Sequence, residues 1–420
     1  MMHEPHDAIQ ITQNRWLQWH TVIVPRFEPF RALRFSETLP LNEVCSPPYD
    51  VLSDSDRLAL ATRHRNNIVH LDMPISDSGN PYDHAAHILR TWVTDGVLTR
   101  DASPSFTLYR MQFTDTTGKL RNVVGVIGAL EVVDEGAGGV LPHERTTPKA
   151  KTDRLELTRA TDANMSPVWG LSLASGLSGL LLEPGEVQGS IVDTEGVIHS
   201  VERVTATRRI NEISSAIAAH PVVIADGHHR YAISRTYRDE TRARTGSSAS
   251  GAELTMTYIN ELIDEQLSVA AIHRLYENIS YKDLAASLSP YFTISDAHPV
   301  DDSTLSTMND RGSLCLISKT GSAHWLTPIA AKFAGVRQLD SAYLEHALSA
   351  VPHEVRYQHG INEVQHELRS TNATAAILIR PVSVSEIQRT ANEGLLMPPK
   401  STFFTPKLRT GFVIRELATR

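Results

Sequence analysis

The sequence predicts an α+β (mixed αβ) fold, because helix-like and strand-like segments follow one another along the chain. Residues 82–95 carry apolar side chains at the spacing of one helix face. Residues 106–113 alternate between apolar and polar side chains, as a half-buried strand does. Residues 122–132, rich in Val, Ile and Gly, follow a short turn, so we expect them to pair with that strand as a hairpin.

Composition is that of a globular protein, with 41% apolar and 21% charged residues in a chain of 420. This length predicts two or three domains, which we place at 21–135, 136–280 and 281–420, after an extension over 1–20. The net charge of −8 argues against a nucleic-acid partner. The two cysteines are far apart, which argues against a disulfide framework.

No apolar run approaches the roughly 20 residues of a membrane span. The first residues lack the basic and apolar parts of a signal peptide. We therefore expect no membrane partner and a cytoplasmic location. The oligomeric state stays open.

The remaining elements follow from local signals. Ser53 or Asp54 can cap a helix that ends near residue 63. Further helices are expected over 155–163, 210–219, the segment that begins at Tyr231, and 384–393. Strands are expected over 67–72, 221–225, 254–259, 267–272 (ending at His273 and Arg274) and 373–379, with strands and turns over 168–182 and 189–203 and a loop over 239–252.

The segment from Asp226 to Arg230 carries the clearest functional signal. It reads Asp-Gly-His-His-Arg and joins the expected strand over 221–225 to a helix. A helix start offers free backbone N–H groups and a favourable dipole to a phosphate, and Gly227 lets the backbone approach it. Arg230 offers a bidentate fork, while His228 and His229 titrate near neutral pH. The alternative is structural: Asp226 as a plain N-cap with solvated histidines behind it.

A second polar stretch lies at 141–167. Arg145, Lys149, Lys151 and Arg154 could neutralise a phosphate, and His143 or Glu144 could move a proton. Such runs are also common in solvated loops. The third stretch is the tail: it places Lys400, Ser401, Thr402 and Lys407 on a proline-stiffened loop. Phe403 and Phe404 predict that this tail is packed, either closing over the same anion or only sealing the core.

These segments together resemble the bacterial and archaeal family called domain of unknown function 1015. The resemblance runs from about Phe27 to Val413. It is carried by separate motifs in the same order, at 29–34, 47–51, 67–72, 141–146, 151–154, 163–167, 225–231, 273–274 and 397–402. Pro399 stands where the family resemblance leads us to expect Gln.

The turn at 226–230 is also similar to the nucleotide-binding box of the ParB/sulfiredoxin-like fold. That resemblance implies a nucleotide-binding core embedded in a larger mixed sheet. Some members of the group are free-serine kinases that use a nucleoside phosphate, so it also implies serine or phosphoserine chemistry. Gly227 and Arg230 would then hold a phosphate.

We therefore expect phosphoryl transfer or phosphate-ester hydrolysis on a small hydroxy or amino acid, with a small anionic metabolite, a nucleotide or both as partners. Glu144 or Asp226 is expected as the base, and His143, His228 or His229 as acid or phosphate ligand. Mg²⁺ is expected to arrive with a nucleoside phosphate. The anion would be held by Arg145, Lys149, Lys151, Arg154, Gly227, Arg230, His273, Arg274, Lys400, Ser401, Thr402 and Lys407.

Two alternatives stay open. The first is a metal-dependent hydrolase with Asp226, His143, His228 and His229 as ligands, although adjacent histidines rarely bind one metal. The second is a regulator that binds a nucleotide or phosphometabolite without turnover.

Overall fold

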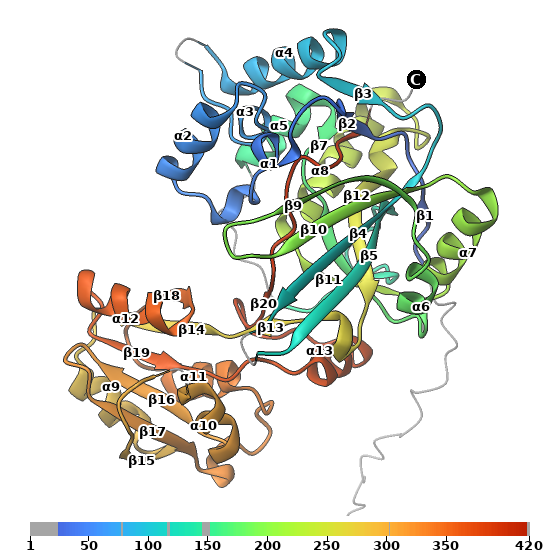
Figure 1. The fold of residues 1–420 in the computed structure, drawn as a ribbon. Coiled ribbons are helices and arrows are strands. Elements are labelled where there is room, and N and C mark those ends of the chain that lie inside the picture. The colour runs from blue at the N-terminus through green and yellow to red at the C-terminus, as the bar shows by residue number, and fades with distance from the viewer. Residues whose placement is uncertain (1–23, 77–78, 116–117, 145–151, 302, 418–420) are drawn as a thin grey trace, which may run out of the picture.

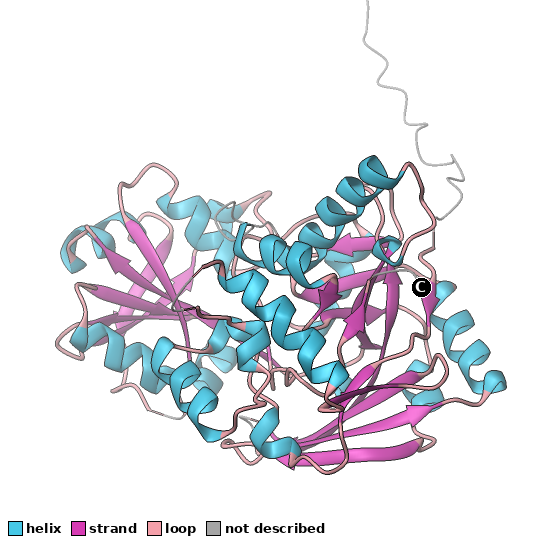
Figure 2. Ribbon diagram, turned by 90° about the horizontal axis from the view of Figure 1, so that it is seen from above, coloured by secondary structure: helices cyan, strands magenta, loops and turns pink. Residues whose placement is uncertain are grey.

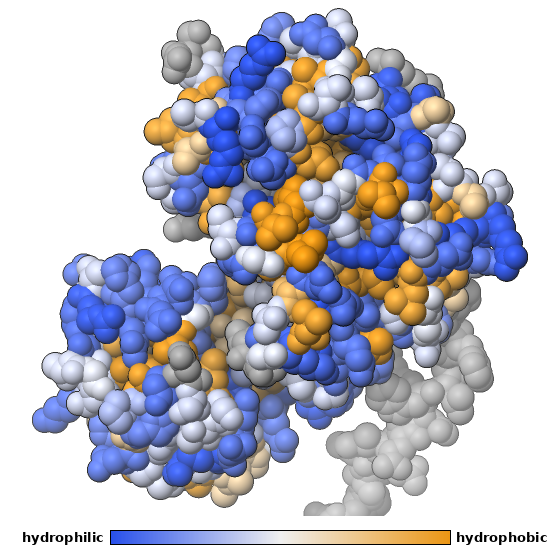
Figure 3. Space-filling model, in the orientation of Figure 1, coloured by the Kyte–Doolittle hydropathy of each residue, from blue (hydrophilic) through white to orange (hydrophobic). Residues whose placement is uncertain are grey.

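The computed structural model describes residues 24–76, 79–115, 118–144, 152–301 and 303–417. Within them, two large sheets form two bodies, which Figures 1 and 2 show side by side with helices around them. The expected α+β class is confirmed. Hydrophilic residues cover most of the face shown in Figure 3, and one apolar patch there lies over β9 and β10, where Val187, Val192 and Ile198 are exposed.

The larger body is built on a mixed nine-stranded sheet with the order β6-β11-β8-β12-β5-β4-β10-β9, and β1 pairs with β5. Its strands are β1 Phe27–Glu28, β4 Phe106–Thr114, β5 Leu120–Glu131, β6 Val140–Pro142, β8 Val168–Ser172, β9 Glu186–Val192, β10 Ile198–Val204, β11 Val222–Asp226 and β12 Leu254–Glu261. The hairpin expected from residues 106–132 is confirmed as β4 and β5.

Helices and short segments surround this sheet. The helices are α1 Leu41–Val44, α2 Asp54–Arg63, α3 Val69–Asp72, α4 Pro81–Thr94, α5 Thr152–Thr161, α6 Leu177–Leu181, α7 Thr207–Ala218 and α8 His228–Thr245. Single 3₁₀ turns are η1 Tyr49–Val51, η3 Gly251–Glu253 and η4 Asp264–Gln266. Two-stranded pairs are β2 Leu33–Phe35 with β3 Leu98–Arg100, β7 Ala163–Asn164 with β21 Arg415–Glu416, and β13 Val269–Ala270 with β20 Phe403–Phe404.

The smaller body has a six-stranded sheet with the order β15-β17-β16-β19-β14-β18, in which every pair is antiparallel. Its elements are β14 Ile272–Glu277, α9 Tyr281–Leu288, β15 Phe292–Asp296, α10 Thr304–Arg311, β16 Leu314–Ser318, β17 Ala323–Pro328, η5 Ala330–Phe333, α11 Asp340–Leu348, β18 Glu354–His359, α12 Ile361–Ser370 and β19 Ala375–Leu378, followed by α13 Val384–Asn392.

The nine-stranded sheet takes strands from both the 21–135 and the 136–280 segments, and the six-stranded sheet begins at Ile272. The domain boundaries expected from the sequence stay predictions. Among the described residues, none of the helices combines the length and the apolar character that crossing a bilayer needs.

The C-terminal tail connects the two bodies. Figure 1 shows it running from the smaller body back across the larger one. Phe404, Leu408 and Phe412 pack with Trp169 and Tyr258 in the core on one face of the large sheet. Phe404 is only 1% exposed. The expectation that the aromatic residues anchor this tail is therefore confirmed for Phe404.

Several expected elements are wrong. The strand expected at 67–72 is the short helix α3, because the Asn67 side chain accepts the Val69 N–H at 3.0 Å and so starts a helical turn. The segment 168–182 contains the helix α6 as well as a strand.

The loop expected over 239–252 is also wrong in part. Helix α8 continues to Thr245 and ends at Gly246, which takes the left-handed conformation with a φ of 67°. The strand expected over 267–272 is split between β13 and β14, and His273 and Arg274 lie inside β14 instead of ending a strand.

Candidate functional site

The turn between β11 and α8 presents a helix start without a side-chain cap. β11 ends at Asp226, Gly227 has a φ of 84°, and α8 begins at His228. A Cβ atom at Gly227 would lie 3.0 Å from Arg230 Nε. Glycine is thus needed both for the left-handed backbone and for the close approach of the guanidinium group. The structural alternative, in which Asp226 is a plain N-cap, is wrong, since Gly227 is the N-cap residue and no side chain caps this helix.

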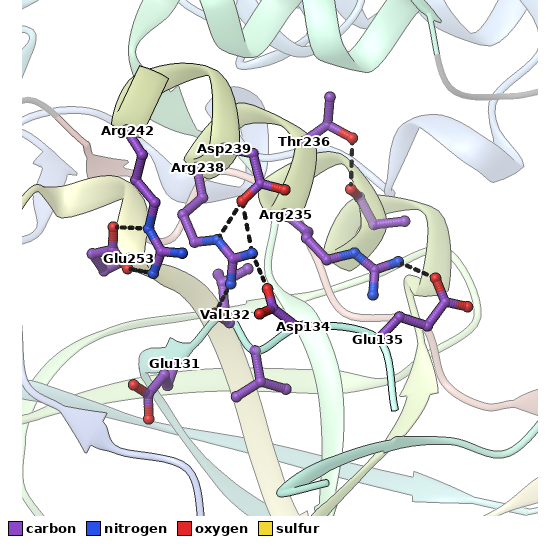
Figure 4. Close-up of polar contacts among 12 residues, drawn as sticks. Glu131, Val132, Asp134, Glu135, Arg235, Thr236, Arg238, Asp239, Arg242 and Glu253 are labelled. Atoms are coloured by element: carbon purple, nitrogen blue, oxygen red, sulfur yellow. Dashed lines mark hydrogen bonds and ion pairs between the residues drawn. The ribbon is translucent and has the colours of Figure 1, made fainter. Parts of the chain in front are cut away.

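Helix α8 is held in place along its length by arginines, as Figure 4 shows. Arg238 donates to the carbonyl of Val132 and pairs with Asp134 just beyond the end of β5. Arg242 and Glu253 pair at 2.9 Å between Nε and Oε1. Arg235 and Glu135 pair at 2.9 Å. These pairs fix the middle and the C-terminal half of α8 to the segment just beyond β5 and to η3.

One pocket of about 140 Å³ is lined by residues from all three polar stretches expected from the sequence, together with Asp50, Val51 and Ile272. The sheet order explains this, because β6 runs parallel to β11 and so carries residue 144 to the end of β11. The tail is joined to the same place by a hydrogen bond of 2.8 Å from Met397 N–H to the His143 carbonyl. The polar lining residues are Asp50, Glu144, Asp226, His228, Lys400, Thr402 and Lys407, and the apolar ones are Val51, Ala225, Ile272, Phe403 and Phe404.

Glu144 is the group in this pocket with a pKa near neutrality. Burial raises the pKa of this carboxyl to about 7, against the opposing effects of the Ser401 N–H and of Lys400. The N–H of Ser401 donates to Glu144 Oε2 at 3.2 Å. A carboxyl that is half ionised near pH 7 can accept and return a proton.

Asp226 behaves in the opposite way. Burial alone would raise the pKa of this carboxyl, but the charges of Lys407 and Arg230 outweigh burial and hold the pKa well below its usual range. Lys407 Nζ lies 3.3 Å from Asp226 Oδ2, and Arg230 Nη2 lies 3.2 Å from the same oxygen. Asp226 is thus a fixed negative charge that orients two cations, and it is a weak base.

His143 is locked. It is fully buried, its Nδ1 lies 2.5 Å from the Ile224 carbonyl and its Nε2 lies 2.8 Å from Thr402 Oγ1. Burial lowers the pKa of this imidazole to about 4, so the ring is neutral: Nδ1–H donates to the carbonyl and Nε2 accepts from the threonine. Both ring nitrogens are occupied, which makes His143 a positioning residue for the tail.

His228 differs, because its Nε2 is buried with no hydrogen-bond partner among the described residues. Its ring lies 5.0 Å from that of His143, and burial lowers the pKa of His228 to about 3. A neutral imidazole at the pocket with an unpaired nitrogen is available to a ligand.

Arg154 and Arg230 do not line this pocket. Arg145, Lys149 and Lys151 are outside the described residues. Arg154 Nη1 lies 3.1 Å from Asp72 Oδ1, and the guanidinium stacks 4.3 Å over the ring of Tyr49. Arg154 and Arg230 line a separate cavity of about 40 Å³. His229 does not line the 140 Å³ pocket.

The residues expected at 273, 274 and 401 act on the backbone around the site. His273 Nδ1 accepts the Ile379 N–H at 3.2 Å, and burial lowers the pKa of His273 to about 3. Arg274 donates to the Lys400 carbonyl at 3.1 Å. The Ser401 hydroxyl donates to the Pro398 carbonyl at 2.7 Å.

Sequence reasoning missed Asp50, which lines the pocket, and Asp72, which pairs with Arg154. The available signal was that both carboxylates belong to motifs of the family resemblance, at 47–51 and 67–72. The cap expected for α2 is confirmed as Ser53, in a capping box with Asp56. Within the described ranges, no group of three or more His, Cys, Asp and Glu side chains could hold a metal ion, so the four-ligand hydrolase arrangement is not formed there.

The fold and the pocket define a mixed αβ protein in which one carboxyl with a raised pKa, one carboxylate held ionised and two lysines line the same pocket. The chain belongs to the family described as protein of unknown function DUF1015, whose sequence pattern matches residues 27–342. No curated protein matches the chain.

Solved structures give weaker similarities. A conserved hypothetical protein from Pyrococcus furiosus is 12% identical, with 66% of this chain and 91% of that chain covered and a TM-score of 0.36. A free serine kinase in complex with AMP is 11% identical, with 66% and 88% covered and a TM-score of 0.36. SbnI with a C-terminal truncation, from Staphylococcus aureus, is 10% identical, with 68% and 85% covered and a TM-score of 0.38.

Proposed function

We propose that this protein catalyses phosphoryl transfer to, or phosphate-ester hydrolysis from, a small hydroxy or amino acid of the serine type. One observation carries the proposal: Glu144, with a pKa of about 7, shares one pocket with Lys400 and Lys407. Phosphoryl transfer needs mostly positioning and charge neutralisation, plus a group that accepts the hydroxyl proton. The serine-type acceptor is the part that rests on the resemblance of the turn at 226–230 to the ParB/sulfiredoxin-like box.

The residues divide the work as follows. Lys400, Lys407 and the uncapped start of α8 hold the phosphoryl group. Glu144 accepts the proton of the acceptor hydroxyl while that oxygen forms its bond to phosphorus. The bond from phosphorus to the oxygen of the donor nucleoside phosphate breaks, and the shortened nucleotide leaves with the electron pair. In hydrolysis, water takes the place of the acceptor hydroxyl and gives its proton to Glu144. The bond that breaks is then the one from phosphorus to the ester oxygen of the small acid, which leaves with the electron pair and takes up a proton.

Mg²⁺ fits the donor set, since it needs only one or two protein carboxylates when phosphates and water supply the other ligands. Asp50 and Asp226 are the carboxylates at the pocket that could serve, since Glu144 is assigned as the base. When bound with a nucleotide, the ion would neutralise phosphate charge.

The experiment incubates the purified protein and Mg²⁺ with L-serine plus ATP, ADP or pyrophosphate, and separately with phosphoserine, and follows products by ³¹P NMR. Glu144→Gln should lose turnover, and Glu354→Gln, an exposed site on β18, should keep it. Undiminished turnover in Glu144→Gln contradicts the assigned base. Nucleotide binding by calorimetry without any turnover contradicts the proposed reaction and leaves the regulator.

A further inference from the structure

A second pocket, of about 230 Å³, lies in the smaller body between α11 and the sheet edge formed by β14 and β18. In the register of these strands, Arg274 stands opposite Tyr357 and Tyr276 opposite Val355. Residues that alternate along paired strands point to the same face, so these four side chains form one wall. Helix α11 forms the other wall with Ser341, Leu344, Glu345 and Leu348.

Arg274 gives this pocket its positive charge. The residue is only 5% exposed, and its guanidinium lies 4.8 Å from the centre of the Tyr357 ring. Burial lowers the pKa of Arg274, while Glu345 and Glu144 are the carboxylates that oppose this effect. A guanidinium group can donate two parallel hydrogen bonds to a planar carboxylate, which the single ammonium charge of a lysine cannot match. A carboxylate is therefore the ligand group that suits Arg274.

The other lining residues restrict the chemical class of the ligand. Glu345 is exposed on α11 and lines the pocket, where it suits an ammonium group. Leu344, Leu348, Val351 and Val355 add aliphatic side chains to a lining that also holds Ser341, Ser349 and His353. The volume is below the roughly 300–1,000 Å³ of pockets that take drug-sized ligands, so the guest is a metabolite of few atoms.

We propose that this pocket binds a small aliphatic α-amino acid, with its carboxylate on Arg274, its ammonium group at Glu345 and its side chain against the leucines and valines. The site is distinct from the 140 Å³ pocket, because the two share no lining residue. This binding does not depend on the proposed phosphoryl transfer.

The pocket is also connected to the tail loop that carries Lys400 and Ser401 by two direct contacts. Arg274 Nη1 donates to the Lys400 carbonyl at 3.1 Å, and Ser341 Oγ lies 3.0 Å from Ser401 Oγ. Lys400 has a φ of 57°, a backbone conformation that costs free energy in a non-glycine residue and needs such support. Ser401 in turn donates its N–H to Glu144. An amino acid on Arg274 therefore orders the loop that carries Lys400.

Calorimetry tests the binding, with L-leucine, 4-methylpentanoate (no ammonium group) and 3-methylbutylamine (no carboxylate) as probes. The wild type should bind L-leucine more tightly than either analogue. Glu345→Gln should weaken the affinity for L-leucine by about tenfold and leave the affinity for 4-methylpentanoate unchanged. The control Glu354→Gln should change neither affinity. Glu345 is exposed, so this variant should fold even where Arg274 substitutions do not. Absence of L-leucine binding by the wild type, or equal L-leucine affinity in Glu345→Gln, overturns the proposal.

Amide hydrogen exchange tests the connection to the loop. Saturation with L-leucine should slow exchange at Ser401 in the wild type by several-fold. At saturating L-leucine, Ser341→Ala should show a smaller slowing of exchange at Ser401 than the wild type, because the hydroxyl contact between the two serines is gone. Unchanged exchange at Ser401 in a calorimetrically saturated wild type overturns the connection.

Discussion

Replacing Glu144 by Gln should change how the stability of this protein depends on pH. Burial raises the pKa of Glu144 from 4.5 to about 7. The folded state thus holds this proton between pH 4.5 and about 7, where the unfolded chain has released it. Stability must fall as pH rises through that window, because the unfolded state then binds fewer protons.

The magnitude follows from the same pKa. Each pKa unit is worth about 1.4 kcal/mol, so ionising Glu144 in the folded protein costs up to about 3 kcal/mol above pH 7. Glutamine has the same shape and cannot ionise. It should lose part of the Ser401 contact, at a cost that does not vary with pH.

The assay is urea unfolding of the wild type, Glu144→Gln and the control Glu354→Gln at several pH values from about 4.5 to 8. The free energy of unfolding of the wild type, taken relative to that of Glu144→Gln, should fall by up to about 3 kcal/mol across this range. The control should follow the wild type. A difference between the wild type and Glu144→Gln that stays constant with pH would refute the raised pKa and with it the assigned base.

Three further predictions follow from the turn at 226–230 and its neighbours. Gly227→Ala should lower the free energy of unfolding by more than Gly321→Ala, because both glycines have a positive φ but only Gly227 lies against a side chain, that of Arg230. The left-handed backbone alone should cost each variant about 1–2 kcal/mol. Urea unfolding measures both losses, and equal losses would contradict the contact with Arg230. Asp226→Asn should have a lower free energy of unfolding than the wild type at neutral pH, because the lowered pKa of Asp226 stabilises the wild type above pH 3.8. This contribution is lost as pH falls, so the two free energies should converge in acid. A difference that persists in strong acid would count against the ion pairs of Asp226. In the wild type, stability should fall as pH drops from 6.5 to about 4, because His143 takes up a proton in the unfolded state and not in the folded one. His143→Gln should reduce this fall, measured as the melting temperature at each pH. An unchanged fall in the variant would show that His143 is not neutral in the folded protein.

The sequence identified the turn at 226–230 and the two charged stretches because each carries a local signal. The pairing of residue 144 with residue 397 could not be predicted, since it depends on β6 lying beside β11 across about 80 residues of chain. Sequence reasoning left Glu144 and Asp226 as equal candidates for the base. Only the positions of Lys407 and Arg230 distinguish their pKa values.

Other differences have similar physical causes. The α3 helix has only four residues, and its alternation of apolar and polar residues resembles a strand until the hydrogen bond from Val69 N–H to the Asn67 side chain is seen. Arg274 was grouped with the phosphate ligands because it is a cation in a shared motif. In the structure, the register of β14 turns the Arg274 side chain toward α11, where it donates to the carbonyl of Lys400.

The central claim is that Lys400, from the tail, and the turn at 226–230 hold one anionic ligand. Calorimetric titration of ADP with Mg²⁺ into the wild type, Lys400→Met and the exposed control Lys332→Met tests it most directly. The wild type and the control should bind alike, and Lys400→Met should lose about tenfold or more in affinity, the worth of one charge-assisted contact. Equal binding by all three proteins, or no binding by the wild type, would contradict a shared anion site.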